Sequence, residues 1–356
     1  MTPATAAHPL PPRRVLLTGG SGYLAMFVLR RLLTAGWAVH ATLRQPAREQ
    51  ALRAALRAPL GAEPGVDDGA LRCFTAELNA DAGWAEAAAG CSHVLHLASP
   101  LPVGQPRDAD ELIVPAREGT LRVLRAARAA GVQRVVMTSS TAAIAYGRGR
   151  GVHHLTEADW TPDDWPRATP YIRAKTLAER AARAWVVAEG DGIEFCSINP
   201  SVVLGPVWGP DHSASVEIVR RLLDGRIPAC PDIGFGAVDA RDVADLHLRA
   251  LTAPGMAGER FIASGRFMKL FQMAELLRRE LGADARRVTR RRVPDALVHV
   301  AALFHPQVRA VAGELGAERH ASSAHARAVL GWQPRAVEDT VLDTARCLLA
   351  LGLVRG

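Results

Sequence analysis

A chain of 356 residues is longer than one minimal hydrophobic core needs, and it suits one large or two modest domains. Hydrophobic residues make up 49% and charged residues 22%, which is typical of a globular rather than a disordered protein. The net charge of +7 comes from dispersed arginines, and aromatic residues are only 5%, so we expect no nucleic-acid surface. No apolar run reaches the roughly 18 residues of a membrane span, and residues 1–12 show no secretory signal. We therefore expect a cytoplasmic protein.

Cysteine and histidine usage predicts no metal site and no disulfide framework. The five cysteines are odd in number, scattered along the chain and without a CxxC pair, as in a reducing compartment. The 12 histidines show no ligand spacing. We expect the adjacent His153 and His154 to lie in a loop.

The segment from Arg14 to Thr34 predicts a strand, a glycine turn and a helix. Val15 to Leu17 form a short apolar run, and apolar residues recur at helical spacing from Tyr23 onward. Between them, Gly19 would allow a tight turn, and Gly22 would let a pyrophosphate approach the backbone at the helix N-terminus. A glycine pattern in this context predicts a dinucleotide site.

A second predicted strand, residues 38–43, ends at Arg44. NAD-selective sites usually hold an acidic residue at this place, whereas an arginine favours the 2′-phosphate of NADP. The alternative is an ordinary solvent-exposed arginine. Further strands are predicted at 71–74, 92–98 and 134–138, with helices at 81–90 and 110–130 between them. This alternation predicts an α/β fold, a Rossmann-type doubly wound parallel sheet with helices on both faces.

Three candidate segments follow at the carboxyl ends of these strands, where cofactors lie in such sheets. After the third strand, Glu77 is placed to reach an adenine amine, next to Leu78. After the fourth, Ala98 opens a loop, and the fifth strand ends in Thr138-Ser139-Ser140.

Tyr171 and Lys175 are four residues apart at the start of a predicted helix, which puts them on one face, one turn apart. The chain has two lysines and three tyrosines in total, so this pairing is unlikely by chance. An ammonium beside a phenol is expected to lower the phenol pKa from about 10 toward neutrality. Such a tyrosine can protonate a substrate oxygen while a serine hydroxyl holds that oxygen. We favour Ser140 over Ser139 for this serine. The alternative is a surface helix pair.

Six motifs in this order, TGGSGYLA, VLHLASP, VVMTSST, YIRAK, INPSVVLGP and VDARDVADLHLRAL, resemble an extended short-chain dehydrogenase/reductase. The branch that is most similar contains dihydroflavonol 4-reductases, cinnamoyl-CoA reductases and aldehyde reductases. The resemblance implies that Tyr171 is the proton donor, Lys175 binds the nicotinamide ribose and Ser140 orients the carbonyl. It implies an NADP site whose residues, with those found above, are Gly19, Gly22, Tyr23, Leu24, Arg44, Glu77, Leu78, Ala98, Thr138, Tyr171, Lys175, Pro200, Val203 and Ser215.

The chain departs from the family pattern at three places. Ala25 replaces the third glycine, Glu77 replaces an aspartate, and the asparagine of the catalytic tetrad has no evident counterpart. Asp239, Arg241, Asp242 and Asp245 look catalytic by type, but a helix cap at Asp239 or Asp242 with a local ion pair of Arg241 accounts for them.

The resemblance also implies two regions and a dimer. Residues 13–203 with 237–265 would form the NADP-binding domain, and 204–236 with 266–356 a smaller, irregular substrate-binding region. Pocket candidates are Trp208, His212, Ile227, Ala143 and the loop from Tyr146 to His154. In the family, the helices at 110–130 and 171–188 pair across a homodimer interface.

We therefore predict an NADPH-dependent reductase of an aldehyde or ketone, with a small-molecule carbonyl substrate. One alternative is a sugar-nucleotide epimerase or dehydratase, which would retain NAD, and Arg44 argues against it. Another is a regulator that senses NADP without turnover, but such relatives usually lack the Tyr-Lys pair.

Overall fold

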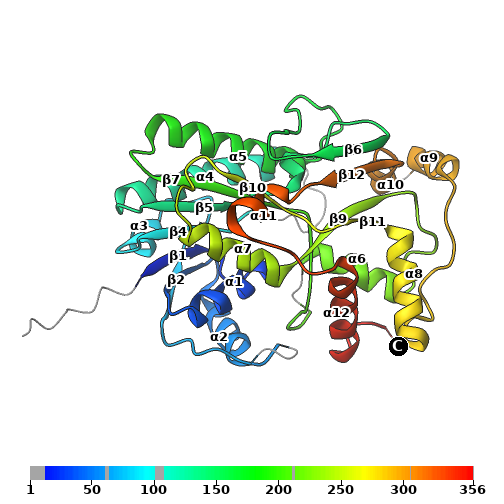
Figure 1. Ribbon diagram of the computed structural model, residues 1–356, viewed down its shortest axis with the longest axis horizontal. Coiled ribbons are helices and arrows are strands. Elements are labelled where there is room, and N and C mark those ends of the chain that lie inside the picture. The colour runs from blue at the N-terminus through cyan, green and yellow to red at the C-terminus, as the bar shows by residue number, and fades with distance from the viewer. Residues whose placement is uncertain (1–12, 61–63, 101–107, 211–212, 305, 356) are drawn as a thin grey trace, which may run out of the picture.

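The computed structural model describes residues 13–60, 64–100, 108–210, 213–304 and 306–355, and a parallel sheet of seven strands forms its centre (Figure 1). The strand order is β10-β7-β5-β4-β1-β2-β3, so the chain turns back between β1 and β4, as in a doubly wound sheet. The strands are β1 (Arg14–Thr18), β2 (Ala38–Leu43), β3 (Leu71–Thr75), β4 (His93–His96), β5 (Arg134–Thr138), β7 (Glu194–Pro200) and β10 (Arg260–Ala263). The predicted fold class is confirmed.

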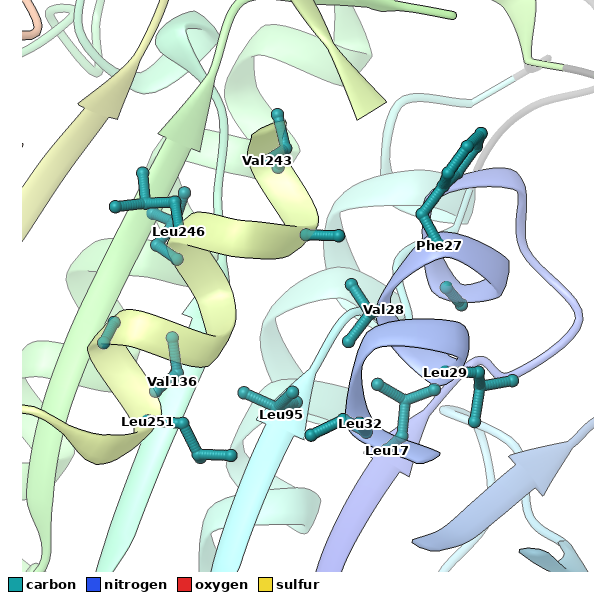
Figure 2. Close-up of a cluster of buried hydrophobic side chains, with 14 of the residues drawn as sticks. Leu17, Phe27, Val28, Leu29, Leu32, Leu95, Val136, Val243, Leu246 and Leu251 are labelled. Carbon is teal, nitrogen blue, oxygen red and sulfur yellow. The ribbon is translucent and has the colours of Figure 1, made fainter. Parts of the chain in front are cut away.

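Helices cover both faces of this sheet because both faces of its strands are apolar. On one face lie α1 (Tyr23–Thr34), α2 (Glu49–Arg57) and α7 (Ala240–Thr252), and on the other α3 (Trp84–Ala88), α4 (Asp110–Ala129) and α5 (Pro170–Glu189). Successive strand residues alternate between them: Leu17 packs with α1 and α7, whereas Leu16 packs in the cluster of α4 and α5. Figure 2 shows the first cluster, where Val28 and Leu32 of α1 and Leu251 of α7 lie together on one face of the sheet.

A second, smaller core lies beside the large sheet. Its sheet has the order β11-β9-β8, with β8 (Val202–Leu204), β9 (Gly234–Asp239) and β11 (Phe267–Lys269). Helices α6 (Ala214–Leu223), α8 (Leu270–Leu281) and α12 (Val337–Ala350) pack against it (Figure 1). The stretches that we expected to be irregular therefore contain regular helices. The reason is that each of these helices buries an apolar stripe in the second core, with α6 and α8 both packed on α12, rather than against the large sheet.

A third unit joins two distant parts of the chain. Strand β6 (Gly151–Leu155) pairs in parallel with β12 (Ala317–Ala321), and α9 (Asp295–Phe304), α10 (Pro306–Ala312) and α11 (Ala324–Leu330) flank β12 in sequence. The prediction of a loop at His153 and His154 was wrong. Both residues lie in β6, and the ring of His154 stacks on His320 of β12, with centroids 5.4 Å apart. No local signal could reveal a partner strand more than 160 residues away.

Short 3₁₀ helices complete the fold: η1 (Pro46–Arg48), η2 (Thr141–Ala143) and η3 (Gly282–Ala285). The capping prediction for α7 is confirmed, because Asp239 Oδ1 accepts from the Arg241 N–H at 2.8 Å and pairs with its guanidinium. Across the described residues, no helix combines the length and the apolar character that a membrane span requires. In the same part of the chain, no three His, Cys, Asp or Glu side chains gather as metal ligands.

Candidate active site

The turn between β1 and α1 brings backbone, rather than side chains, to the carboxyl edge of the sheet. Gly19 has a φ of +71°, and a Cβ on it would lie 3.0 Å from the Cα of Ala98. A Cβ on Gly22 would lie 3.2 Å from the Gly19 carbonyl oxygen. The N–H groups of Gly19 and Gly20 donate to the Oγ1 and the carbonyl oxygen of Thr42, at 3.1 and 2.8 Å. The turn is thus rigid and has no room for a side chain.

The first turn of α1 has free hydrogen-bond donors. Its N-cap is Gly22, so no side chain caps the helix, and the first turn carries no acidic residue. Its leading N–H groups have no partner within the helix, and they carry the positive end of the helix dipole. An anion such as a dinucleotide pyrophosphate therefore fits this cradle, which a Cβ would fill.

A chain of neutral hydrogen bonds holds the loop after β4 against this turn. The Ala98 N–H donates to Thr18 Oγ1 at 2.9 Å, and that hydroxyl contacts His96 Nδ1 at 2.9 Å. His96 Nε2 contacts Thr120 Oγ1 at 3.1 Å, and Thr120 in turn donates to the Ala116 carbonyl. Burial lowers the pKa of His96 to about 3, so the ring is neutral. Its Nε2 then donates to Thr120, and its Nδ1 accepts from Thr18.

Three predicted cofactor residues line the same edge farther along. Arg44 follows β2 directly, is exposed and makes no hydrogen bond or ion pair with any described residue. Glu77 is exposed beyond β3. Leu78 is half-buried against Gly119 of α4, where an added Cβ would lie 2.6 Å from the Leu78 Cβ. Leu78 can therefore pack against α4 at this edge only because Gly119 has no side chain.

Tyr171 and Ser140 meet at the end of β5. Ser140 caps η2, with its Oγ accepting from the Ala142 N–H at 3.1 Å. Burial raises the pKa of Tyr171, and only the neighbouring Ser140 side chain opposes this rise. The expected lowering of the Tyr171 pKa by Lys175 was wrong for this state of the protein. Ser139 points elsewhere, because its Oγ donates to Glu179 Oε2 at 2.6 Å.

Lys175 lies one turn beyond Tyr171, buried under the end of β5. Its Nζ donates to the Thr138 carbonyl oxygen at 3.3 Å, and burial lowers its pKa to about 8. Thr138 Oγ1 contacts His247 Nε2 at 2.7 Å, while His247 Nδ1 contacts the Val243 carbonyl at 2.8 Å. Burial lowers the pKa of His247 to about 4, so Nδ1–H donates and Nε2 accepts from Thr138. These hydrogen bonds link Lys175 to the end of β5, and the end of β5 to α7.

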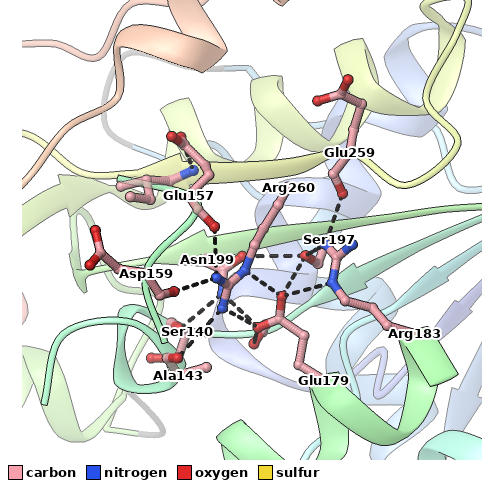
Figure 3. A network of polar contacts seen from close by, with 12 residues as sticks. Ser140, Ala143, Glu157, Asp159, Glu179, Arg183, Ser197, Asn199, Glu259 and Arg260 are labelled. Carbon is pink, nitrogen blue, oxygen red and sulfur yellow. Dashed lines mark hydrogen bonds and ion pairs between the residues drawn. The ribbon is translucent and has the colours of Figure 1, made fainter. Parts of the chain in front are cut away.

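Glu179 continues the row from Tyr171 and Lys175 at another interval of four, and it is fully buried (Figure 3). It pairs with Arg260 of β10 at 2.7 Å and accepts from Ser197 and Asn199 of β7, both at 2.8 Å. Burial opposes its charge, but Arg260, Ser139 and Arg183 together outweigh burial and hold the Glu179 pKa below its usual range. Asn199 Nδ2 also donates to the Ser140 carbonyl at 3.1 Å. We call Ser140, Tyr171, Lys175 and Glu179 the Tyr171 cluster.

Comparisons with known proteins agree with this geometry. The model of the NAD dependent epimerase/dehydratase family matches residues 15–263. The chain belongs to this family of extended short-chain dehydrogenases/reductases. The cinnamoyl-CoA reductase CAD2 of Medicago truncatula is 35% identical over 260 residues, covering 71% of this chain and 74% of that protein. A dihydroflavonol 4-reductase of Gerbera hybrida is 30% identical over 274 residues, covering 75% and 72%.

Solved structures share the fold. The yeast methylglyoxal/isovaleraldehyde reductase Gre2, complexed with NADPH, superposes with a TM-score of 0.76. It is 23% identical in sequence, and the match covers 96% of this chain and 100% of that one. The predicted resemblance to the extended short-chain dehydrogenases/reductases is thus confirmed in sequence and in fold.

The remaining predicted cofactor residues of this extended reductase occupy different settings. The Tyr23 hydroxyl is buried, has no hydrogen-bond partner in the described chain and packs away from the turn, its ring against Phe27. Burial and the Asp239 charge raise the Tyr23 pKa well above its ordinary value. Pro200 is buried at the end of β7, and Val203 is half-buried in β8. Leu24 is half-buried in the first turn of α1, and Ser215 stands in the first turn of α6.

The residues that we predicted to line a substrate pocket lie in different parts of the fold. Trp208 packs on Phe27 with ring centroids 4.6 Å apart, Ile227 packs in the second core, and Ala143 is buried behind Ser140. His212 lies outside the described residues. The segment after Tyr146 does border a cavity of about 320 Å³, lined among others by Gly147, Arg148, Arg150 and Trp165.

Sequence reasoning missed three supporting residues. We found no counterpart for the family asparagine, yet Asn199 is buried and holds the backbone of Ser140. Glu179 was detectable, since it lies on the helix face of Tyr171 and Lys175. Arg260 was not, because its guanidinium reaches Glu179 across 81 residues of sequence and stacks on Trp160, 3.7 Å from the ring centroid.

Proposed function

We propose that this extended reductase is an NADPH-dependent oxidoreductase that reduces an aldehyde or ketone carbonyl to an alcohol. The observation that carries the proposal is the position of Tyr171 beside Ser140 at the end of β5, one helical turn from the buried Lys175 and at the edge where the glycine turn opens. The similarity to cinnamoyl-CoA and dihydroflavonol reductases, and to the fold of an NADPH-bound reductase, supports it. NADPH, when bound, supplies the hydride that reaches the carbonyl carbon.

The residues of the chain account for the proton. Because burial raises the Tyr171 pKa, its phenol is protonated at neutral pH and can give that proton to the carbonyl oxygen. The Ser140 hydroxyl donates to the same oxygen and orients it. One carbonyl double bond is thus converted to an alcohol, and Tyr171 regains its proton from solvent. Lys175, anchored on the Thr138 carbonyl, would hold the nicotinamide ribose.

The cofactor-binding roles belong to the same proposal. Gly19, Gly22, Tyr23 and Leu24 would present backbone to the pyrophosphate, and Ala98 would contact a ribose. Arg44 would pair with the 2′-phosphate, since it is exposed and free within the described chain. Glu77 and Leu78 would meet the adenine. Thr138, Pro200, Val203 and Ser215 would complete the nicotinamide side.

The test is oxidation of NADPH and NADH by the purified protein with a panel of aldehydes, ketones, a dihydroflavonol and an aryl-CoA thioester. We expect turnover that prefers NADPH and that falls roughly 10²–10⁴-fold in Tyr171→Phe, because the proton donor is lost. Nucleotide binding, followed by fluorescence, should survive in the variant. Tight binding without oxidation of any substrate would overturn the reductase, and NAD retained through purification would favour the epimerase instead.

We also propose a cytoplasmic homodimer, with residues 204–236 and 266–356 forming the substrate-binding region. The dimer would pair α4 and α5, which pack together on one face and expose Val114 and Val187, the latter 90% exposed. Light scattering on Val187→Glu should show a shift from dimer to monomer. An unchanged mass would place the contact elsewhere.

A further inference from the structure

Arg319, on β12, has a buried guanidinium with one edge unused. Its side chain is 10% exposed, and it lies over the ring of Tyr146, with Cζ 4.6 Å from the centroid. Nη1 pairs with Glu314 at 2.6 Å. Nε and Nη2 are buried and have no hydrogen-bond partner in the described part of the chain. Buried guanidinium donors are rarely left unpaired, so this edge lacks its partner.

The free edge has the geometry of a two-oxygen receptor. In a planar guanidinium, the Nε–H and the outer Nη2–H point the same way, and together they bind the two oxygens of a carboxylate. A lysine or a single hydroxyl cannot offer this pair of donors. Glu314 occupies only Nη1, so it does not block the edge.

Tyr146 connects this edge to the Tyr171 cluster. It follows Ser140 by six residues and the end of η2 by three, and its ring stacks on Trp165 with centroids 6.1 Å apart. Burial raises the Tyr146 pKa to about 12, with Glu314 and Tyr171 adding to the rise and Arg319 opposing it. Tyr146 therefore lies within electrostatic range of both Arg319 and Tyr171. Its hydroxyl makes no hydrogen bond with another described residue.

The surroundings do not repel an anion. Trp165 also lines the 320 Å³ cavity, whose other walls include Arg148, Arg150, Arg167 and His299. Asp159 pairs with Arg148 and Asp295 pairs with Arg150, at 2.6 and 2.7 Å. Arg167 has no partner among the described residues, so the cavity keeps a surplus of positive charge.

We propose that Arg319 is a specificity-determining residue that binds a carboxylate of the substrate, so that the preferred carbonyl compound is an oxo acid or a formyl acid. The inference rests on the proposed reductase function. Nε and Nη2 donate to the two carboxylate oxygens, and the carbonyl then lies against Ser140 and Tyr171. The same carbonyl compound with the acid esterified offers one acceptor fewer and no charge, so it binds less well.

The test compares acids with their methyl esters, using 4-formylbenzoate and phenylglyoxylate with NADPH. We expect the wild type to prefer at least one acid roughly tenfold in kcat/KM, as hydrogen bonds to a charged group give. Arg319→Met should lower kcat/KM for that acid by roughly 10–100-fold and for its ester by less than about threefold. Arg319→Lys should recover little, because it lacks the second donor. Arg327→Met, an exposed arginine of α11, is the control and should change nothing.

Binding measurements separate this inference from the proposed function. Quenching of tryptophan fluorescence by benzoate, with benzamide as the neutral match, should show benzoate binding in the wild type and its loss in Arg319→Met, even without turnover. Equal kcat/KM for acid and ester in the wild type, or equal losses for both in Arg319→Met, would overturn the inference while leaving the reductase intact. Absent NADPH oxidation with intact benzoate selectivity would instead overturn only the reductase.

Discussion

The glycine turn at Gly19 and the Tyr171 cluster lie at one edge of the same sheet but are held together by different forces. The turn consists of backbone in close contact, with Gly19 at a positive φ and an added Cβ only 3.0 Å from the Cα of Ala98. The Tyr171 cluster consists of buried titratable side chains whose partners come from β5, β7 and β10. The first is a steric device, and the second is an electrostatic one.

This difference decides how each region responds to change. A steric device fails when atoms are added, and the loss is confined to the turn. A buried ionic cluster fails when one partner is removed, because the charges left behind have neither water nor a counter-ion. Substitutions in the Tyr171 cluster should therefore reduce stability as well as activity, whereas those in the turn should mainly reduce nucleotide binding.

The largest stability effect is expected from Glu179→Gln. The substitution leaves the buried Arg260 and the half-buried Arg183 without their carboxylate, which should lower the free energy of unfolding by about 3–5 kcal/mol. Urea denaturation measures this loss. Glu280→Gln is the matched control, since its partner Arg279 is exposed, and it should cost less than about 1 kcal/mol. A similar small loss for Glu179 would show that the cluster does not depend on its charge.

The next largest expected effect is a dependence of the free energy of unfolding on pH, which the buried histidines cause. Burial lowers the pKa of His96 to about 3 and of His247 to about 4, against 6.5 when unfolded. The unfolded state thus binds more protons below pH 6.5, so stability falls as the pH drops from 6.5 toward 4. Each ring contributes up to about 1.4 kcal/mol per pH unit.

Urea unfolding between pH 6.5 and pH 5 measures this slope. The slope should be shallower in His247→Gln, and unchanged in His299→Gln, where the histidine is exposed on α9. Identical slopes in the wild type and in His247→Gln would mean that His247 is charged in the native protein.

Gly19→Ala tests the steric device. Its Cβ would press on Ala98 and its φ is unfavourable, so NADPH binding should weaken roughly 10–100-fold, with a strain of about 1–3 kcal/mol. Gly36→Ala is the matched control, because Gly36 has a similar φ of +77° but open space around it. It should lose stability without losing nucleotide affinity. Equal affinity in both variants would show that the close approach to Ala98 does not shape the turn.

The smallest effect is expected at Arg44, which is exposed. Arg44→Ala should raise the Kd of NADPH roughly tenfold and leave that of NADH unchanged, since only NADPH carries the 2′-phosphate. Titration by nucleotide fluorescence measures both constants. Arg31→Ala, an exposed arginine on α1, is the control. Equal losses for the two nucleotides would place the 2′-phosphate elsewhere.

Much of the large sheet was predictable because its signals are local. Val15 to Leu17 form a buried run, the helix after Tyr23 repeats its apolar residues every turn, and Asp239 caps α7 within three residues. The spacing of Tyr171 and Lys175 likewise put them on one helix face. Family membership followed from the same motifs.

Local signals could not predict the second core, the pairing of β6 with β12, or the pKa of Tyr171. His153 and His154 became strand residues because a distant strand satisfied their backbone, and the phenol pKa rose because burial outweighed the effect of Ser140.

The amino-acid sequence by itself therefore determined the parallel sheet, the glycine turn and the identity of the residues at its edge, since each depends on neighbours a few positions away. Only the tertiary structure decided which buried charges meet. Glu179 finds Arg260 across 81 residues, and the free edge of Arg319 is apparent only once β12 lies beside β6. Desolvation depends on everything that packs around a group, and no short stretch of sequence contains that information.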